Sequence, residues 1–91
     1  MLQIGHNHAE GVVKLRVPDP KSDGGWIVQR MSAAAARELA NWLADGPPDK
    51  RLKVTDGTRW AEHEIPNDSA LKFAEDLWRC ADLLEGISRE A

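Results

Sequence analysis

The stretch Trp26-Ile-Val-Gln-Arg-Met31, followed without a break by Ser32-Ala-Ala-Ala-Ala36, decides the fold. The first six residues are rich in side chains that favour strands, and the alanines after them are the best helix formers. Ser32 is a suitable N-cap, because its hydroxyl can accept hydrogen bonds from the free amides of the first helical turn. Farther along, Gly46 can take the left-handed position after a helix, and Pro47 cannot continue one. The stretch therefore predicts a strand over 26–31 that leads directly into a helix ending at Asp45.

This helix has one apolar face. Spacings of three and four residues bring Ala36, Leu39 and Leu43 together, and Ala35, Ala40 and Trp42 lie beside them. The opposite face carries the polar residues Arg37, Glu38, Asn41 and Asp45. A helix of this kind must bury its apolar face, and a sheet built from strands such as 26–31 is the nearest surface for it.

The rest of the chain predicts three more strands and a second helix. Alternation of apolar and charged residues over 12–17 indicates a half-buried strand, and the Pro- and Gly-rich stretch 18–25 indicates a loop. Alternation resumes over 51–55, where Asp56-Gly57 favours a two-residue hairpin turn before a returning strand. Pro66 to Ser69 then break that strand and cap a helix that Gly86 ends.

Each half of the chain thus reads as strand, strand, helix. We expect a single domain, 1–91, of the α+β class: a two-layer sandwich with a tandem ββα-ββα repeat, a four-stranded antiparallel sheet and two helices on one face. Residues 1–11 are weakly patterned, and we expect them to form a flexible N-terminal segment.

The hairpin turn determines which side chains face the helices. A two-residue turn places Lys53 opposite Trp60 and Arg51 opposite Glu62, and alternation then turns these four residues away from the helices. By analogy between the halves, Trp26, Val28 and Arg30 also face outward, with Lys14 and Arg16. A slip of one residue in the strand 26–31 would instead bury Trp26 and Val28.

The outward face is the candidate binding surface. An exposed apolar centre with a mixed-charge rim is typical of protein interfaces, and tryptophan and arginine are frequent anchors. The predicted partner-binding residues are Trp26, Val28, Arg30, Lys53, Trp60, Glu62 and Arg16. The alternative interpretation is an ordinary solvated surface, in which Lys53 over Trp60 is a cross-strand pair and Arg51 with Glu62 a weak ion pair.

Composition limits the class of protein. The 91 residues carry a net charge of −3, a 42% hydrophobic fraction and four tryptophans, which indicates an ordinary globular domain. Cys80 is the only cysteine, so no intramolecular disulfide is possible. No apolar run approaches the length of a membrane span, and the N-terminus does not resemble a signal peptide. We expect a cytoplasmic protein without membrane contact.

Catalytic and metal-binding patterns are weak. His6 and His8 would share a face of a strand and could pair on a metal, with Glu10 or His63 as a third ligand, but no further spacing supports such a site. On a strand, the His63 side chain points away from Glu62 and Glu64. The serines lie in turns, caps or the C-terminal tail, and Cys80 borders an apolar helix face. We therefore expect no enzyme activity and no cofactor.

Three functions fit these observations. The leading one is a non-catalytic protein that binds a macromolecular partner and forms a homodimer; small proteins of this style are common among phage and mobile-element inhibitors, anti-CRISPR proteins included. The alternative is a single-stranded nucleic-acid-binding module that stacks bases on Trp26 and Trp60, although Glu62 and Glu64 on the same face oppose it. The third is an enzyme subunit or metal protein that uses His6, His8 and His63.

Overall fold

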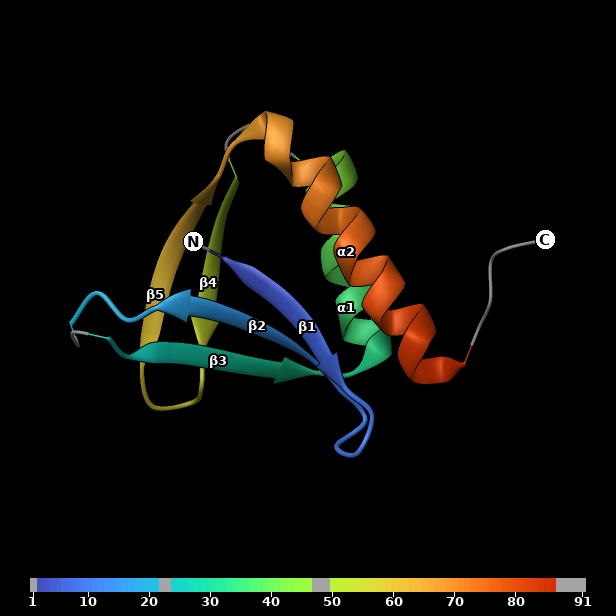
Figure 1. Ribbon diagram of the computed structural model, residues 1–91. Coiled ribbons are helices and arrows are strands. Elements are labelled where there is room, and N and C mark those ends of the chain that lie inside the picture. The colour runs from blue at the N-terminus through green and yellow to red at the C-terminus, as the bar shows by residue number, and fades with distance from the viewer. Residues whose placement is uncertain (1, 22–23, 47–49, 87–91) are drawn as a thin grey trace.

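The computed structural model describes residues 2–21, 24–46 and 50–86 (Figure 1). Along the chain, its elements are β1 (Gln3–Asn7), β2 (Val12–Pro18), β3 (Trp26–Met31), α1 (Ala33–Asp45), β4 (Lys50–Thr55), β5 (Trp60–Ile65) and α2 (Asn67–Glu85). The α+β class, the two helices and the hairpin before each helix are as the sequence predicts.

The predicted four-stranded sheet is wrong. The strands form two separate antiparallel sheets, one in the order β1-β2-β3 and one made of β4 and β5. Figure 1 shows β4 and β5 crossing behind β2 and β3 instead of extending their sheet. Where β4 approaches β3, the backbone amide of Thr55 donates to the side-chain oxygen of Gln29, at 3.1 Å. At this point β3 and β4 are joined by a hydrogen bond to a side chain, whereas one continuous sheet would join them by backbone hydrogen bonds.

The N-terminal segment, expected to be flexible, contains a strand that the sequence did not predict. Gln3 to Asn7 pair with Arg16 to Val12 as the edge strand β1. Leu2 is buried in the core and Ile4 packs against it, so the apolar side chains of this short segment hold it in place. Gly11, with a φ of 69°, supports the tight turn into β2, since its amide donates to the Asn7 carbonyl.

The first helix follows its predicted limits, with one exception. The Ser32 hydroxyl accepts from the Ala35 amide at 3.1 Å, which confirms the predicted N-cap. Gly46 is not left-handed as predicted, because its φ of −77° and ψ of −175° are extended. The reason is its position before a proline, which disfavours helical backbone angles and favours extended ones.

The hairpin of β4 and β5 has a longer turn than predicted. Thr55 pairs with Trp60, so residues 56–59 connect the strands, and Lys53 lies opposite Glu62 instead of Trp60. The Asp56 carboxylate accepts from the amides of Thr58 and Arg59, at 2.9 and 2.8 Å, and this Asx turn stabilises the longer connection. The register differs from the predicted one by two residues, so every side chain still lies on its predicted face.

The second helix begins at Asn67, inside the stretch Pro66 to Ser69 that was predicted to cap it. Pro66 is the N-cap residue, and no side chain forms a capping hydrogen bond. Gly86 takes the left-handed conformation, with a φ of 69°, as predicted. The two helices pack on one another, and Arg37 of α1 pairs with Asp82, at 3.0 Å, and with Glu85 of α2. The hydrogen bonds to these carboxylates raise the pKa of the Arg37 guanidinium, and the bond to Glu85 has a larger effect than the bond to Asp82.

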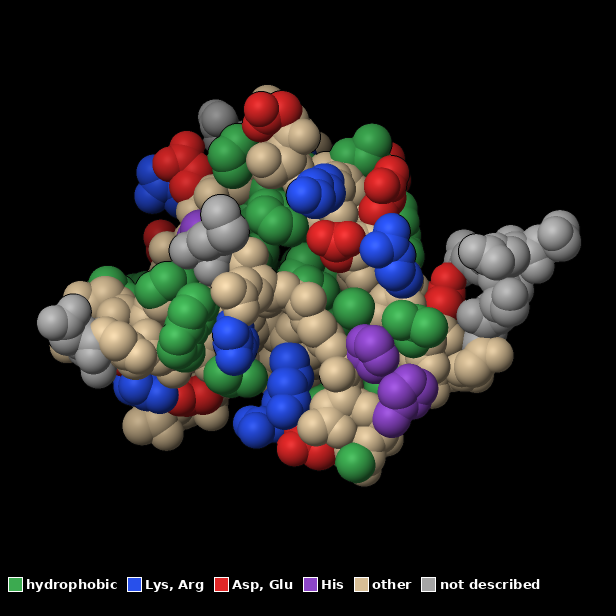
Figure 2. Space-filling model, viewed as in Figure 1, with side chains coloured by type: hydrophobic (Ala, Val, Ile, Leu, Met, Phe, Trp, Pro, Cys, Tyr) green, Lys and Arg blue, Asp and Glu red, His purple; other side chains and the backbone are tan. Residues whose placement is uncertain are grey.

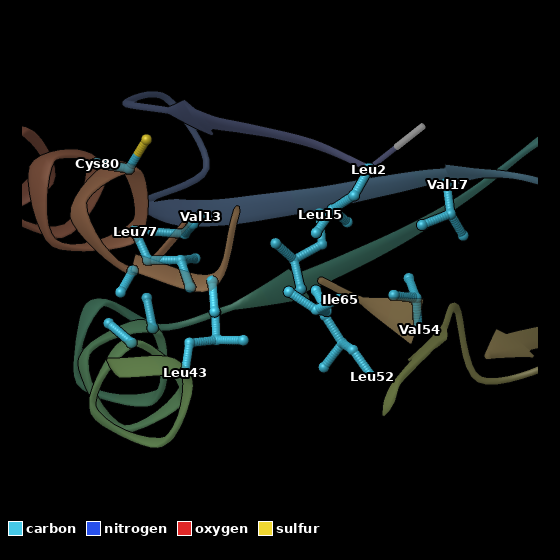
Figure 3. Close-up of a cluster of buried hydrophobic side chains, with 14 of the residues drawn as sticks. Leu2, Val13, Leu15, Val17, Leu43, Leu52, Val54, Ile65, Leu77 and Cys80 are labelled. Carbon is cyan, nitrogen blue, oxygen red and sulfur yellow. The ribbon is translucent and has the colours of Figure 1, made fainter. Parts of the chain in front are cut away.

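The buried side chains form one continuous core. At one end, Val13 of β2 lies beside Leu43 of α1 and Leu77 of α2; at the other end, Leu15 and Val17 approach β4 and β5 (Figure 3). The β4–β5 sheet contributes Leu52, Val54 and Ile65 to the same core. The inner face of β1–β3 is therefore covered by the helix pair at one end and by the second sheet at the other.

Candidate functional site

The seven predicted partner-binding residues do not lie on one face. Four of them, Arg16, Trp26, Val28 and Arg30, belong to β2 and β3, and the other three, Lys53, Trp60 and Glu62, belong to β4 and β5. Because the inner faces of the two sheets share one core, their outer faces point away from each other. The single predicted surface is therefore two surfaces, and the sequence missed this because the pairing of the two halves was inferred only from their similarity.

The first surface is the outer face of β4 and β5. Trp60 is 53% exposed, and the Lys53 ammonium lies 4.9 Å from the centre of its ring. Arg51 and Glu62 form an exposed ion pair at 3.9 Å. The cations Arg51 and Lys53 lie on β4, and the acidic residues Glu62 and Glu64 lie on β5. We name this group of residues, together with Trp60, the Trp60 face.

The second surface is the outer face of β1, β2 and β3, which we name the Arg16 face. Trp26 is 36% exposed, and the Arg16 guanidinium lies 4.7 Å from the centre of its ring. Arg30 lies opposite Lys14 on the neighbouring strand. Figure 2 shows Lys and Arg side chains gathered across the middle of this sheet. The predicted exposure of both tryptophans is confirmed, although on separate faces.

Glu10 is the acidic residue that contacts the Arg16 face. Its carboxylate lies 3.1 Å from the Arg30 Nε and 3.5 Å from the Lys14 Nζ. The hydrogen bond from Arg30 lowers the pKa of Glu10, so the carboxylate is ionised at neutral pH. Glu62 and Glu64, which opposed nucleic-acid binding when the face was taken as one, lie on the other sheet.

An ion pair that the sequence did not reveal joins the two hairpins. Asp19, at the end of β2, is 8% exposed, and its carboxylate lies 3.0 Å from an Nη of Arg59 in the β4–β5 turn. Arg59 also donates to the Trp26 carbonyl, at 3.2 Å, and to Asp56. A shallow pocket of about 160 Å³ beside this pair is lined by Asp19, Lys21, Thr58, Arg59 and Trp60. Asp19 lies in a predicted loop and Arg59 in the predicted returning strand, and at neither position does a charged residue give a signal of this ion pair.

His6 and His8 lie together, but among the described residues no third ligand joins them. The rings of His6 and His8 are in edge contact, with centroids 5.0 Å apart, but Glu10 is engaged by Arg30 and Lys14. In the described part of the chain, no cluster of three or more His, Cys, Asp or Glu side chains has the arrangement of a metal site. Burial lowers the pKa of His63, whose side chain alternates with the exposed Glu62 and Glu64 as predicted.

Cys80 packs on the inner side of α2. Its side chain belongs to the core cluster, and burial raises the pKa of the thiol. Since the thiolate is the nucleophilic form, this environment favours packing over reactivity.

Comparison of the chain with protein-family models, with curated proteins and with solved structures found no match. Neither helix of the described residues has the length and apolarity that crossing a lipid bilayer requires.

Proposed function

We propose that this chain is a small non-catalytic interaction protein that acts by binding a macromolecular partner, with the Trp60 face as its protein-binding surface. The observation that carries the proposal is an indole that is 53% exposed at the end of a row of two cross-strand charge pairs, Lys53 with Glu62 and Arg51 with Glu64. Tryptophan is among the residues that contribute most to binding when a partner covers them. Leaving it uncovered on a small domain is unfavourable unless a partner buries it.

The occupant that this face fits best is a second copy of the chain. Arg51 and Lys53 lie on β4 directly across from Glu64 and Glu62 on β5. A copy turned over by a twofold axis parallel to the strands places its β4 on β5 of the first copy. Each cation of one copy then lies over a carboxylate of the other, and each Trp60 lies over Thr55 of the other copy, at the turn end of the contact. Such a self-complementary contact is what an isologous dimer requires.

Edge-to-edge pairing of two β5 strands is a less favourable arrangement. An antiparallel pair of these strands brings Glu62 and Glu64 of both copies side by side, and like charges across a ladder are destabilising. The proposal is therefore limited to the face-to-face dimer.

The first test compares two tryptophans. Light scattering after size-exclusion chromatography, over a range of concentrations, gives the dissociation constant of the wild type. Trp60→Ala should weaken the dimer by about 30-fold or more, which is the effect of losing an interface anchor. Trp26→Ala is the matched control, because Trp26 is also exposed under a cation but lies on the other sheet. A wild type that stays monomeric at all concentrations refutes the dimer.

A charge exchange tests the orientation. Lys53→Glu and Glu62→Lys should each weaken self-association, because each places like charges across the twofold axis. Mixing the two variants should restore association, since the altered charge of one copy then meets the opposite altered charge of the other. The charges within each monomer stay unfavourable in the mixture, so recovery reports on the contact between copies. Failure to recover would refute this orientation.

The identity of a partner other than a second copy needs a separate test. The prediction that the chain is a phage or mobile-element inhibitor of the anti-CRISPR type stays a prediction, and affinity capture of defined host complexes with wild type and Trp60→Ala tests it. Binding that requires Trp60 would support an inhibitor that uses this face.

A further inference from the structure

The Arg16 face contains a hollow with a glycine as its floor. The hollow measures about 210 Å³ and is lined by Gln3, Ile4, Gly5, His6, Lys14 and Arg16. Gly5 lies opposite Lys14 on the neighbouring strand, and a Cβ atom added at Gly5 would meet no other atom within 4 Å. The missing side chain therefore opens a space on the outer face of the sheet, beside two cations.

One of these cations is held in place from two sides. An Nη of Arg16 donates to the Gln3 side-chain oxygen at 2.6 Å, and the guanidinium lies 4.7 Å from the centre of the Trp26 ring. A guanidinium has five N–H donors, and the described residues use one of them in this bond. Arg16 thus presents further donors from a fixed position, which lowers the entropic cost of binding an anion.

The charge of this face is positive although the chain is acidic. Lys14, Arg16 and Arg30 contribute three cations, and among the described residues Glu10 is the single carboxylate in contact with them. The excess negative charge lies elsewhere, because α2 contains five acidic and two basic residues, a net charge of −3 that equals that of the whole chain.

We propose that the Arg16 face binds single-stranded nucleic acid, with a backbone phosphate in the hollow over Gly5 and a base stacked on Trp26. This site lies on a different sheet from the Trp60 face and goes beyond the function proposed above. Basic grooves beside exposed aromatic rings are the usual means of holding single strands. The hollow is smaller than the roughly 300–1,000 Å³ of pockets that enclose a drug-sized ligand, so it suits one phosphate of a longer ligand.

The binding experiment measures the anisotropy of a short labelled oligothymidylate at 50 and 200 mM salt. With three cations engaged, the slope on a double-logarithmic plot should be about −2, so the affinity should fall about 20-fold between these concentrations. Absence of binding at the lower salt concentration overturns the proposal.

A variant that fills the hollow tests most directly whether a phosphate binds there. Gly5→Val adds a side chain where the structure has open space. Because valine favours strands, this variant should leave the melting temperature unchanged or raise it. Binding should nevertheless be lost or fall severalfold. Glu10→Gln removes the opposing carboxylate and should tighten binding. If binding by Gly5→Val equals that of wild type, the phosphate is not in the hollow and the proposal is wrong.

Two pairs of matched variants locate the site. Arg16→Gln should weaken binding and reduce the salt slope by about 0.7, whereas Arg51→Gln, which changes an arginine on the other sheet, should do neither. Trp26→Ala should weaken binding about tenfold through lost stacking, and Trp60→Ala should not. Equal losses from both members of a pair contradict the assignment to this face.

Competitors decide what is recognised. Unlabelled oligothymidylate should displace the labelled strand, whereas polyglutamate and inorganic phosphate at equal charge concentration should not. Equal displacement by polyglutamate would show a response to any polyanion, and displacement by phosphate would show a site for the free anion. Either result overturns recognition of a nucleic-acid strand.

Discussion

Replacing Arg59 with alanine should destabilise the fold by about 1–3 kcal/mol, although this side chain is 49% exposed. The cost arises at its partner, because the Asp19 side chain is only 5% exposed. Without Arg59, that carboxylate keeps one hydrogen bond within the described part of the chain, from the Lys21 amide at 2.9 Å. The Trp26 carbonyl loses a donor as well, so the two hairpins lose their charged connection.

The reverse replacement should cost less. Asp19→Asn removes the buried charge and leaves Arg59 half in water, so we expect a loss of about 1 kcal/mol. Combining Arg59→Ala with Asp19→Asn should then cost about 1 kcal/mol less than the sum of the single changes. Arg79→Ala is the control, because this arginine is exposed on α2 and should change stability by less than about 0.5 kcal/mol.

Urea unfolding followed by tryptophan fluorescence gives these free energies, provided that the m-value stays constant. The protein should be dilute, so that self-association does not contribute. Losses that add within about 0.5 kcal/mol would show that the two residues are not coupled. The reasoning would equally be refuted if Asp19→Asn cost more than Arg59→Ala.

Ala74→Leu should lower stability by about 1–3 kcal/mol in the same assay, because Ala74 is fully buried in α2 and a larger side chain overpacks the core. Hydrogen bonds from the amides of Arg59 and then Thr58 lower the pKa of Asp56 to about 2. The stabilisation from ionised Asp56 is therefore present above about pH 4 and lost as the pH falls toward 2, and Asp56→Ala should flatten this part of the stability–pH profile. Cys80 should react with iodoacetamide slowly in the native protein and rapidly in urea, since burial raises the pKa of its thiol; equal rates would contradict its burial.

Local patterns were sufficient to place most elements and faces. Ser32, with the alanines after it, predicted the start of α1, and alternation predicted that Ile27 is buried and Trp60 exposed. Even the error in the β4–β5 turn changed no face, because it shifted the register by two residues and side chains alternate with a period of two. Sequence periodicity therefore carries information about the direction of a side chain that does not depend on its partner strand.

The arrangement of the two halves was beyond such reasoning. The halves separate where Gln29 binds the Thr55 amide through its side chain, and a glutamine within a strand gives no sign of this role. Strand β1 was missed because Ile4 is the only strongly apolar residue between Gln3 and Asn7. Asp19 was missed for a different reason: its burial depends on Arg59, forty positions later, and no local pattern reports a contact of that separation.

The division into two sheets changes what the same residues can do. On one shared face, Glu62 and Glu64 would repel a phosphate from Arg16 and Arg30, and the basic residues would weaken the balance of charge that a twofold contact needs. On opposite faces, Arg51 and Lys53 are matched by two carboxylates, while Lys14, Arg16 and Arg30 outnumber Glu10. A dimer formed through the Trp60 face would leave the Arg16 face of each copy uncovered. The two proposed activities therefore do not compete for surface, and each can fail without the other.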